Sequence, residues 1–414
     1  MEEEINPNQS NDAGSQSYFL PSARAGHRYL TQLGNDYLPS NAFTDIWIDG
    51  IDKTGLHFFP EKKQITGIPK SSGSYDMQLF IRKYDASGTE ELSTRNLTIL
   101  IEDDFNVPFS EVDENAPYPK RDVEVYTFSV NRGDKQRLKK DLAAASRRGH
   151  LHIEQGKIRE DDFYIRYDHK TRWYALAVAD GAGKSKYSRK GSQIACSSVV
   201  ESCLEQLSAK SQQLKKLTIR YGRKKVDKIR KEIVENLQNV ISTSVINAFR
   251  EIESEAQSRN CQPEDYATTL LMCICKKFEF GWLIGAYSVG DGAICVYHKD
   301  KWYANLLGGG ENSVKKSFLT SPGIIQQNEL EQRIRFTIVD DFSTLFLMTN
   351  GVSDPKFGCE ADMPCFELWN RFWDDIASDV NFSGKINDIG EELLKWLDFW
   401  CPGKYDDRTI AVVF

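Results

Sequence analysis

Polar side chains stand at the ends of five strand-like segments in the second part of the chain, and four of these five positions are acidic. Carboxylates beside buried strands are costly unless a positive charge compensates them. In chain order the segments read IREDDFYI, WYALAVADGAG, GWLIGAYSVGDGAICVY, TLFLMTNGVSD and YDDRTIAVVF. The residues at these positions are Glu160-Asp161-Asp162, Asp180-Gly181, Asp291, Asn350-Gly351 and Asp406-Asp407.

This set of side chains favours a site for a hard divalent cation. Oxygen ligands suit Mg²⁺ and Mn²⁺, and the glycine after Asp180 lets the backbone approach an ion and offer its carbonyl. Zinc is disfavoured, because no histidines or cysteines stand at the spacing of a zinc site. One Asp-Gly after a strand is more often a plain turn, and we interpret Asp291 as part of a hairpin. The repetition nevertheless predicts an acidic metal site with phosphoryl chemistry.

Composition restricts the class of protein. The 414 residues leave room for two or three domains, and a net charge of −7 argues against a chain that binds polyanions. The N-terminal residues lack the features of a signal peptide, and no apolar run approaches the roughly 18 residues of a membrane span. The nine scattered cysteines are typical of free thiols in a reducing cytoplasm. We therefore expect a cytoplasmic protein that binds no membrane.

The pattern of hydrophobic and turn residues predicts the domain organisation. Residues 1–17 are expected to be disordered, and residues 18–103 show the period-two alternation of a small β-sandwich. Residues 104–122 are rich in proline and charge and are interpreted as a linker. A mixed α/β domain is expected over residues 123–414, with its main helical region within 192–260.

A densely basic stretch runs from Lys210 to Lys231 within the helical region. It is consistent with a nucleic-acid patch, but a solvated helix face is the favoured interpretation, because it fits the acidic balance of the rest of the chain. Nucleic acid is therefore not expected as a partner.

The N-terminal sandwich carries a more specific pattern. In GLHFFPEKKQITGIPKSSGSYDMQLFIRKYD, a Gly-Leu-x-Phe strand leads to an Ile-x-Gly-x-Pro turn and then to a Gly-x-Tyr strand. The pattern resembles immunoglobulin-like, dystroglycan-type cadherin-like domains over about 50 residues. Such modules bind protein partners or act as spacers, and both roles stay open here. The residues that carry the resemblance are Gly55, Leu56, Phe58, Ile65, Gly67, Pro69, Gly73 and Tyr75.

Taken in order, the five acidic segments and the strand YATTLLMCI resemble the metal-dependent type 2C family of Ser/Thr protein phosphatases. The resemblance covers roughly residues 145 to 414 and is strongest to a bacterial branch of the family. It implies two antiparallel sheets packed face to face with helices on both outer sides, a four-layer αββα sandwich. It also implies a binuclear Mn²⁺ or Mg²⁺ site that activates water for attack on phosphorus. A phosphorylated protein would be the substrate, with a Ser/Thr kinase as a cognate partner.

The resemblance assigns roles residue by residue. Asp180 would bridge both metals, and the carbonyl of Gly181 would hold one of them. Asp161 and Asp406 would complete the catalytic carboxylates, with Asp162 as the alternative to Asp161 if the register differs by one. The remaining positions are Asp291, expected beside a third, weaker metal; Asn350, on a metal-binding aspartate; and Asp407, in the place of an asparagine.

Three departures from the family pattern bear on activity. Asn350 is neutral, which predicts weaker metal occupancy. No histidine follows Asp180-Gly181 as a general acid, and the nearby His150 and His152 are more simply read as strand histidines satisfied by hydrogen bonds. The arginine that would bind phosphate is replaced by glycine. Its neighbours Lys157 and Arg159 are the candidates to serve instead.

Several functional hypotheses follow from these residues. The first is a cytoplasmic protein Ser/Thr phosphatase, weakened or silenced by Asn350, whose N-terminal domain binds a partner. The second is a pseudophosphatase that binds phosphoproteins without turnover. Under a third, Asn350 replaces a native aspartate by design, to trap a complex. A nuclease with the same acidic cluster ranks last, because the chain is acidic overall.

Overall fold

The computed structural model describes residues 17–34, 37–38, 45–84, 90–102, 117–130, 140–299, 301–307, 317–357, 365–383, 388–399, 401 and 406–414. Residues 1–16 of the segment predicted to be disordered (1–17) and most of the predicted linker lie outside them, whereas Ser17 belongs to a strand. The chain divides into two compact units, each taken by itself below. One comprises Met1–Asn106 and Asp398–Gly403, and the other Val107–Leu397 and Lys404–Phe414.

The first unit is a β-sandwich, as the alternating pattern predicts. Its core lies between two sheets, and alternate residues of the long strands point into it: Leu97, Ile99 and Ile101 are buried. One sheet has the order β1-β8-β7-β4 with β2 beside β8, and the other has the order β3-β6-β5. The elements are β1 (Ser17–Phe19), β2 (Ala23–Arg24), β3 (Tyr29–Gln32), β4 (Asp45–Asp49), η1 (Ile51–Thr54), β5 (Leu56–Phe59), η2 (Pro60–Lys62), β6 (Gln64–Gly67), β7 (Gly73–Tyr84) and β8 (Glu90–Glu102).

The second unit contains two antiparallel sheets. The first has the order β16-β15-β18-β19-β10-β9, and the second has the order β11-β12-β13-β14-β17. The strands are β9 (Val123–Phe128), β10 (Leu142–Arg147), β11 (Asp162–Tyr167), β12 (Tyr174–Ala179), β13 (Leu270–Phe278), β14 (Gly281–Val289), β15 (Ala293–His298), β16 (Trp302–Asn305), β17 (Ile334–Val339), β18 (Thr344–Met348) and β19 (Arg408–Val413).

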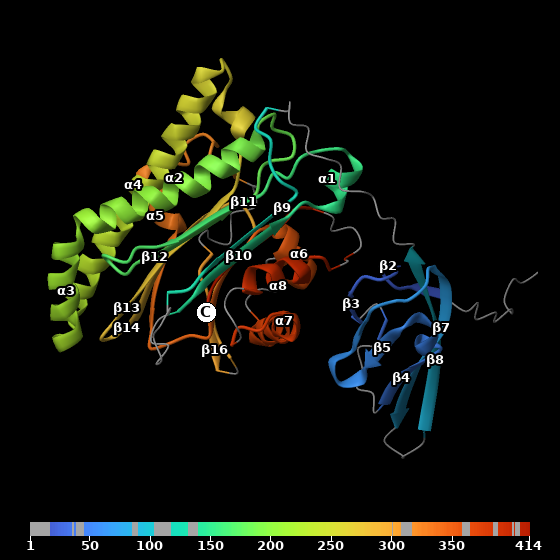
Figure 1. Cartoon of the computed structure of the whole chain (residues 1–414). Helices are drawn as coiled ribbons and strands as arrows, with labels where there is room; N and C mark the ends of the chain where they lie inside the picture. The colour runs from blue at the N-terminus through green and yellow to red at the C-terminus, as the bar shows by residue number, and fades with distance from the viewer. Residues whose placement is uncertain are drawn as a thin grey trace, which may run out of the picture. The chain divides into compact units, whose positions relative to one another are not determined.

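Helices cover both outer faces of these sheets (Figure 1). Helices α2 and α4 pack together on the sheet of β12, whereas α8 packs on β10 and β9 of the other sheet. The result is the expected four-layer αββα arrangement. The helices are α1 (His150–Glu154), α2 (Ser188–Ala209), α3 (Ser211–Lys224), α4 (Asp227–Ser258), η3 (Pro263–Tyr266), α5 (Gln327–Arg333), α6 (Asn350–Phe357), α7 (Phe366–Asp379) and α8 (Ile389–Trp396).

The position of strand β12 in the fold explains why its sequence is a continuous apolar run. All six residues are buried, because helices cover one face and the second sheet covers the other. The small residues Ala175, Ala177 and Ala179 belong to the core under the helices. The larger Tyr174, Leu176 and Val178 belong to the core between the sheets. Small side chains on the helical face let α2 approach the strand closely.

One local prediction was wrong. The turn at Asp291 does not close a hairpin, because β14 and β15 belong to different sheets and the chain crosses between them there. After β18, helix α6 begins directly at Asn350. In both places the sequence shows a short apolar run followed by a glycine, and this pattern does not indicate which element comes next.

Among the described residues, no helix combines the length and hydropathy needed to cross a membrane.

A close helix contact makes Gly191 a test of the packing of the second unit. A Cβ atom at Gly191 in α2 would lie 1.9 Å from the carbonyl oxygen of Tyr266. We expect Gly191→Ala to lower the free energy of unfolding by about 1–3 kcal/mol through overpacking. Urea denaturation followed by the helical circular dichroism signal measures this change, because the α-helices lie in this unit.

The matched control is Gly222→Ala in helix α3. There the nearest atom to a new Cβ, Cδ1 of Phe280, lies 3.7 Å away, which is ordinary contact. Alanine is favoured over glycine in a helix by up to about 1 kcal/mol, so this variant should be as stable as the parent or more stable. Equal destabilisation of both variants would contradict the packing argument.

Candidate active site

Four chain segments meet at one end of the paired sheets. The pairing of β11 with β12 sets Asp162 opposite Ala179, so Asp161 and Asp180 stand side by side just beyond the paired residues. The pairing of β18 with β19 ends at Met348 and Ile410, and the backbone N–H of Thr349 donates to the Thr409 carbonyl at 3.1 Å. The ends of both sheets therefore bring the sequence-predicted positions together.

Asp407 forms the densest set of contacts in this region. Its Oδ1 accepts a hydrogen bond from the backbone N–H of Gly149 at 2.7 Å and lies 3.0 Å from Nδ1 of His152. Its Oδ2 accepts from the backbone N–H groups of Glu160 at 2.6 Å and Asp161 at 3.3 Å. Both carboxylate oxygens are occupied by protein donors, so Asp407 holds the surrounding segments in place and has little capacity left for an ion.

Charge binds His152 and Asp407 together. Burial alone would lower the pKa of His152, but its close contact with the Asp407 carboxylate and the negative charge there raise that pKa to about 9. Burial would likewise raise the pKa of Asp407, yet the contact with His152, the charge of His152 and the backbone donors lower it. At neutral pH the two side chains therefore form a buried ion pair.

Asp161, and not Asp162, belongs to the acidic cluster. Its Oδ2 accepts a hydrogen bond at 2.7 Å from the hydroxyl of Thr349, which itself accepts from the N–H of Thr409. Its Oδ1 is buried without a hydrogen-bond partner among the described residues. Asp162 pairs instead with Lys120, at 2.7 Å between Nζ and Oδ2.

The backbone of Asp180 is fixed by two threonines that directly precede the neighbouring strand β13. Its N–H donates to the hydroxyl of Thr269 at 2.8 Å, and its carbonyl accepts from the N–H of Thr269 and the hydroxyl of Thr268. The next residue must be small, because a Cβ at Gly181 would lie 2.9 Å from the carbonyl oxygen of Glu160. These contacts hold the backbone of Asp180 in place directly after β12.

The carboxylates crowd one another in this position. Burial raises the pKa of Asp180 well above its ordinary value, and the negative charges of Asp161, Asp406 and Asp291 raise it further. Burial and Asp407 likewise raise the pKa of Asp406. The cluster thus carries uncompensated negative charge, which is the electrostatic condition that favours a bound cation.

Asp291 and Asn350 reach the cluster from the crossing between sheets and from the start of α6. Asp291 lies between Gly290 and Gly292, whose φ angles of +93° and +120° suit glycine. A Cβ at Gly292 would lie 2.5 Å from the carbonyl oxygen of Met348, so the crossing is held against the end of β18. The Oδ1 atom of Asn350 is buried and has no hydrogen-bond partner among the described residues.

The structure places His152 and Glu160 closer to the centre of the site than the sequence analysis predicts. His152 is only 5% exposed and lies in helix α1, not in a strand as predicted. Its Nε2 lies 3.7 Å from Oε2 of Glu160, and together with Asp406 and Asp407 it could offer ligand atoms to a metal. Its close pairing with Asp407 favours a positioning role. A histidine so far from Asp407 in sequence carries no local signal of that contact.

The two candidates for phosphate binding differ in their surroundings. Arg159 is fully buried, and its guanidinium lies 2.7 Å from Oε2 of Glu124 and donates to the carbonyl of Arg121. Lys157 is exposed, and its Nζ lies 3.4 Å from the carbonyl oxygen of Gly183 in the loop after Asp180-Gly181. Lys157 is therefore the candidate whose charge reaches solvent beside the cluster.

The donor atoms of the cluster fit a hard divalent cation. They are carboxylate, amide and carbonyl oxygens, which Mg²⁺ and Mn²⁺ prefer. Oxygens of Asp161, Glu160 and Asn350 are buried with no hydrogen-bond partner among the described residues. A buried oxygen without a donor is costly, and a cation bound to it would offset that cost.

Comparison with known proteins identifies a family. Residues 148–398 match the sequence model described as protein phosphatase 2C. No curated protein sequence matches the chain. Among solved structures, a bacterial serine phosphatase is 13% identical, with 66% of this chain and 96% of that chain covered and a TM-score of 0.39.

Two further solved structures are eukaryotic. A serine-threonine phosphatase 2C from Toxoplasma gondii is 13% identical, with 70% of this chain and 98% of that chain covered and a TM-score of 0.43. A C. elegans sex determining protein is 16% identical, with 67% of this chain and 65% of that chain covered and a TM-score of 0.42.

Neighbouring aspartates in the cluster should respond oppositely to loss of charge. In EDTA, we expect Asp407→Asn to lower the free energy of unfolding by roughly 2–4 kcal/mol, because it leaves the buried His152 cation and several N–H donors poorly paired. Asp406→Asn should leave stability unchanged or raise it, since the pKa of Asp406 is raised in the folded state and its charge is therefore unfavourable there. Urea denaturation of both variants checks the signs. Two losses of similar size would contradict the distinction between a structural and a ligand aspartate.

Proposed function

The chain belongs to the protein phosphatase 2C family, and from that premise we propose that it hydrolyses phosphoserine and phosphothreonine in proteins with the help of divalent cations. One observation carries the proposal. Carboxylates from four separate segments, including Asp161, Asp180, Asp291 and Asp406, crowd one end of the sandwich, where burial and mutual repulsion raise the pKa of Asp180. Hydrolysis of a phosphorylated peptide in the presence of Mn²⁺ tests it.

The proposed metal ligands are oxygen atoms of the acidic cluster. Asp180, Asp406 and the carbonyl of Gly181 would hold two Mn²⁺ or Mg²⁺ ions, with Asp161 and Asn350 beside them. Asp291 would serve a third and weaker position. When bound, the ions supply a water activated for in-line attack and neutralise charge on the phosphoryl group. We propose Asp161, Asp180 and Asp406 as the catalytic carboxylates.

The other residues of the site prepare it for a phosphorylated substrate. Asp407 holds the backbone of Glu160 and Asp161 through its hydrogen bonds, so the position of the Asp161 carboxylate follows from it. Lys157 presents a cation to solvent beside the loop of Gly183, where it can attract a dianionic phosphate. His152 is buried between Asp407 and Glu160, which favours a role in orienting them.

Asn350 sets the charge of the site. We expect Asn350→Asp to bind Mn²⁺ about tenfold more tightly, because ligand charge tunes the affinity of oxygen sites. Calorimetric titration with Mn²⁺ measures this change, and hydrolysis of a phosphothreonine peptide should rise with it. Asn260→Asp is the matched control, since it adds the same charge at an exposed position on a different loop. If neither the parent chain nor Asn350→Asp hydrolyses the peptide at saturating Mn²⁺, the hydrolase proposal fails.

A second candidate function is a phosphoprotein-binding module without turnover. The neutral Asn350 favours it, as does Ala182, which leaves no histidine directly after Asp180-Gly181. Under this alternative, fluorescence anisotropy should detect binding of a labelled phosphothreonine peptide to the Mn²⁺-loaded chain, and the peptide should be recovered intact, also with Asn350→Asp. Lys157→Ala should weaken binding by about tenfold, since it removes an exposed cation. Equal affinity for the unphosphorylated peptide would exclude this function.

Partners and location extend the proposal. A phosphorylated protein and its cognate Ser/Thr kinase are the expected partners. We propose that the sandwich of residues 18–103 is an immunoglobulin-like or cadherin-like module that binds a protein, joined by residues 104–122 to the catalytic domain of 123–414. A cytoplasmic location is supported by free cysteines such as Cys196 and Cys273, whose thiol pKa burial raises.

A further inference from the structure

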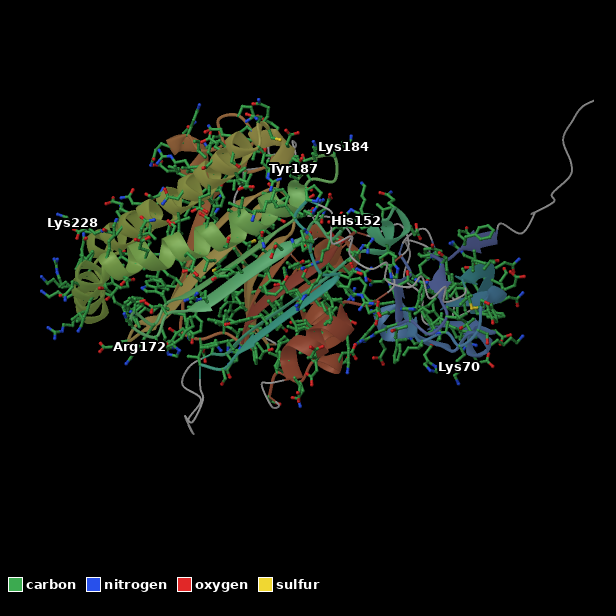
Figure 2. All side chains as sticks on the ribbon, turned by 45° about the horizontal axis from the view of Figure 1, so that its top comes forward. Lys70, His152, Arg172, Lys184, Tyr187 and Lys228 are labelled. Carbon is green, nitrogen blue, oxygen red and sulfur yellow. The ribbon has the colours of Figure 1, made fainter. Side chains whose placement is uncertain are left out.

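A polar cavity lies far from the acidic cluster within the same unit. It has a volume of about 750 Å³ and is lined by helix α3, by the turn between β11 and β12 and by the end of β13. Trp173 precedes β12 and lines the cavity, whereas Asp180 follows β12 in the acidic cluster. At about 3.3 Å per residue, the strand separates the two sites by roughly 20 Å. Figure 2 shows Arg172 and His152 at opposite ends of this unit.

Positive charge dominates the cavity lining. Five cationic side chains line it, against one carboxylate, that of Glu279. None of the five forms an ion pair with a described residue. The cations are Lys170, Arg172, Lys215, Lys276 and Lys277. The hydroxyl group of Ser211 adds a polar group to the same lining, whereas the Thr218 hydroxyl donates to the Leu214 carbonyl within helix α3.

Lys276 shows that this positive charge is only partly compensated by nearby carboxylates. The side chain is half-buried, its Nζ donates to the Thr171 carbonyl at 2.6 Å and lies 5.0 Å from the centre of the Phe278 ring. Burial lowers the pKa of Lys276, and the charges of Arg172 and Lys215 lower it further against the opposing effect of Asp168. Cations that repel one another in a partly desolvated cavity gain from an anion placed between them.

The backbone of the turn supports the same reading. Arg172 has a φ of +62°, a region that non-glycine residues enter rarely and at a cost. A glycine would fit this turn without strain. The sequence instead places a cation there, at the rim of the cavity, where its guanidinium can reach an anion in bidentate geometry.

We propose that this cavity binds a small oligophosphate anion, either an inorganic chain or the phosphates of a nucleotide. Its volume lies within the range of small-molecule sites, and several separated cations suit a ligand with several phosphoryl groups better than a single phosphate. The cavity is distinct from the acidic cluster, and the proposal does not depend on the phosphatase function.

Isothermal titration calorimetry of the full chain with sodium tripolyphosphate in EDTA buffer tests the proposal. EDTA keeps divalent cations from the acidic cluster, which then repels polyanions, so binding reports on the basic cavity. We expect tripolyphosphate to bind, and the double variant Arg172→Glu with Lys215→Glu to weaken binding at least tenfold. Titration with ATP identifies the source: tenfold tighter binding than tripolyphosphate indicates a nucleotide, and equal affinity indicates recognition of the phosphate chain alone.

A matched control separates a built site from diffuse charge. Lys224→Glu with Lys228→Glu makes the same change of charge on exposed residues of α3 and α4 that do not line the cavity. This control should change the affinity by less than twofold. The proposal is overturned if the parent binds neither probe, if the control weakens binding as much as the cavity variant, or if a single-stranded oligonucleotide binds more tightly than either probe.

Discussion

The buried carboxylate of Asp407 is the contact on which the arrangement of the acidic cluster depends. It stands at the entrance to β19, a central strand of its sheet, and accepts hydrogen bonds from backbone groups before β11 and at the start of α1. A buried charge of this kind is tolerated because N–H donors and the His152 cation surround it. The other carboxylates of the acidic cluster have no such set of donors. The charge of Asp407 is thus compensated by protein groups, and Asp407 positions carboxylates whose charge is not.

The scaffold behind the cluster owes its firmness to close backbone contacts. Alanines of β12 bring helix α2 near the sheet, and Gly191 lets the start of that helix touch the carbonyl of Tyr266. Gly181 and Gly351 allow similar approaches within the cluster itself, and a Cβ at Gly351 would lie 1.9 Å from the carbonyl oxygen of Asp407. Functional groups mounted on strand ends with so little free space keep their geometry better than groups on long loops.

Most strands of the fold could be predicted from local patterns, because an apolar run of the right length that ends in polar residues indicates a strand. Which strands pair with one another could not be predicted in this way. The crossing at Asp291 resembles a hairpin in sequence, because the local sequence does not indicate that β14 and β15 belong to different sheets. The choice between Asp161 and Asp162 was equally open, because a shift of one residue exchanges the faces of a strand.

The contribution of distant residues was the least accessible part of the site. His152 acquires its role from Asp407, which lies near the other end of the domain in sequence, so no spacing rule could have found the pair. Arg159 has the residue type of a phosphate ligand, yet the buried guanidinium pairs with the exposed carboxylate of Glu124. Residue type indicates what chemistry is available, and only tertiary contacts decide where the side chain applies it.

The start of helix α6 separates the shape of the site from its charge. Gly351 is confined by the carbonyl of Asp407, so the backbone beside the cluster has no freedom to vary. Asn350 in the same turn has the outline of an aspartate without its charge, and the two amino acids are a single base change apart in the genetic code. Evolution could therefore raise or lower the electrostatic strength of this site in either direction, one mutation at a time, without rebuilding the protein around it.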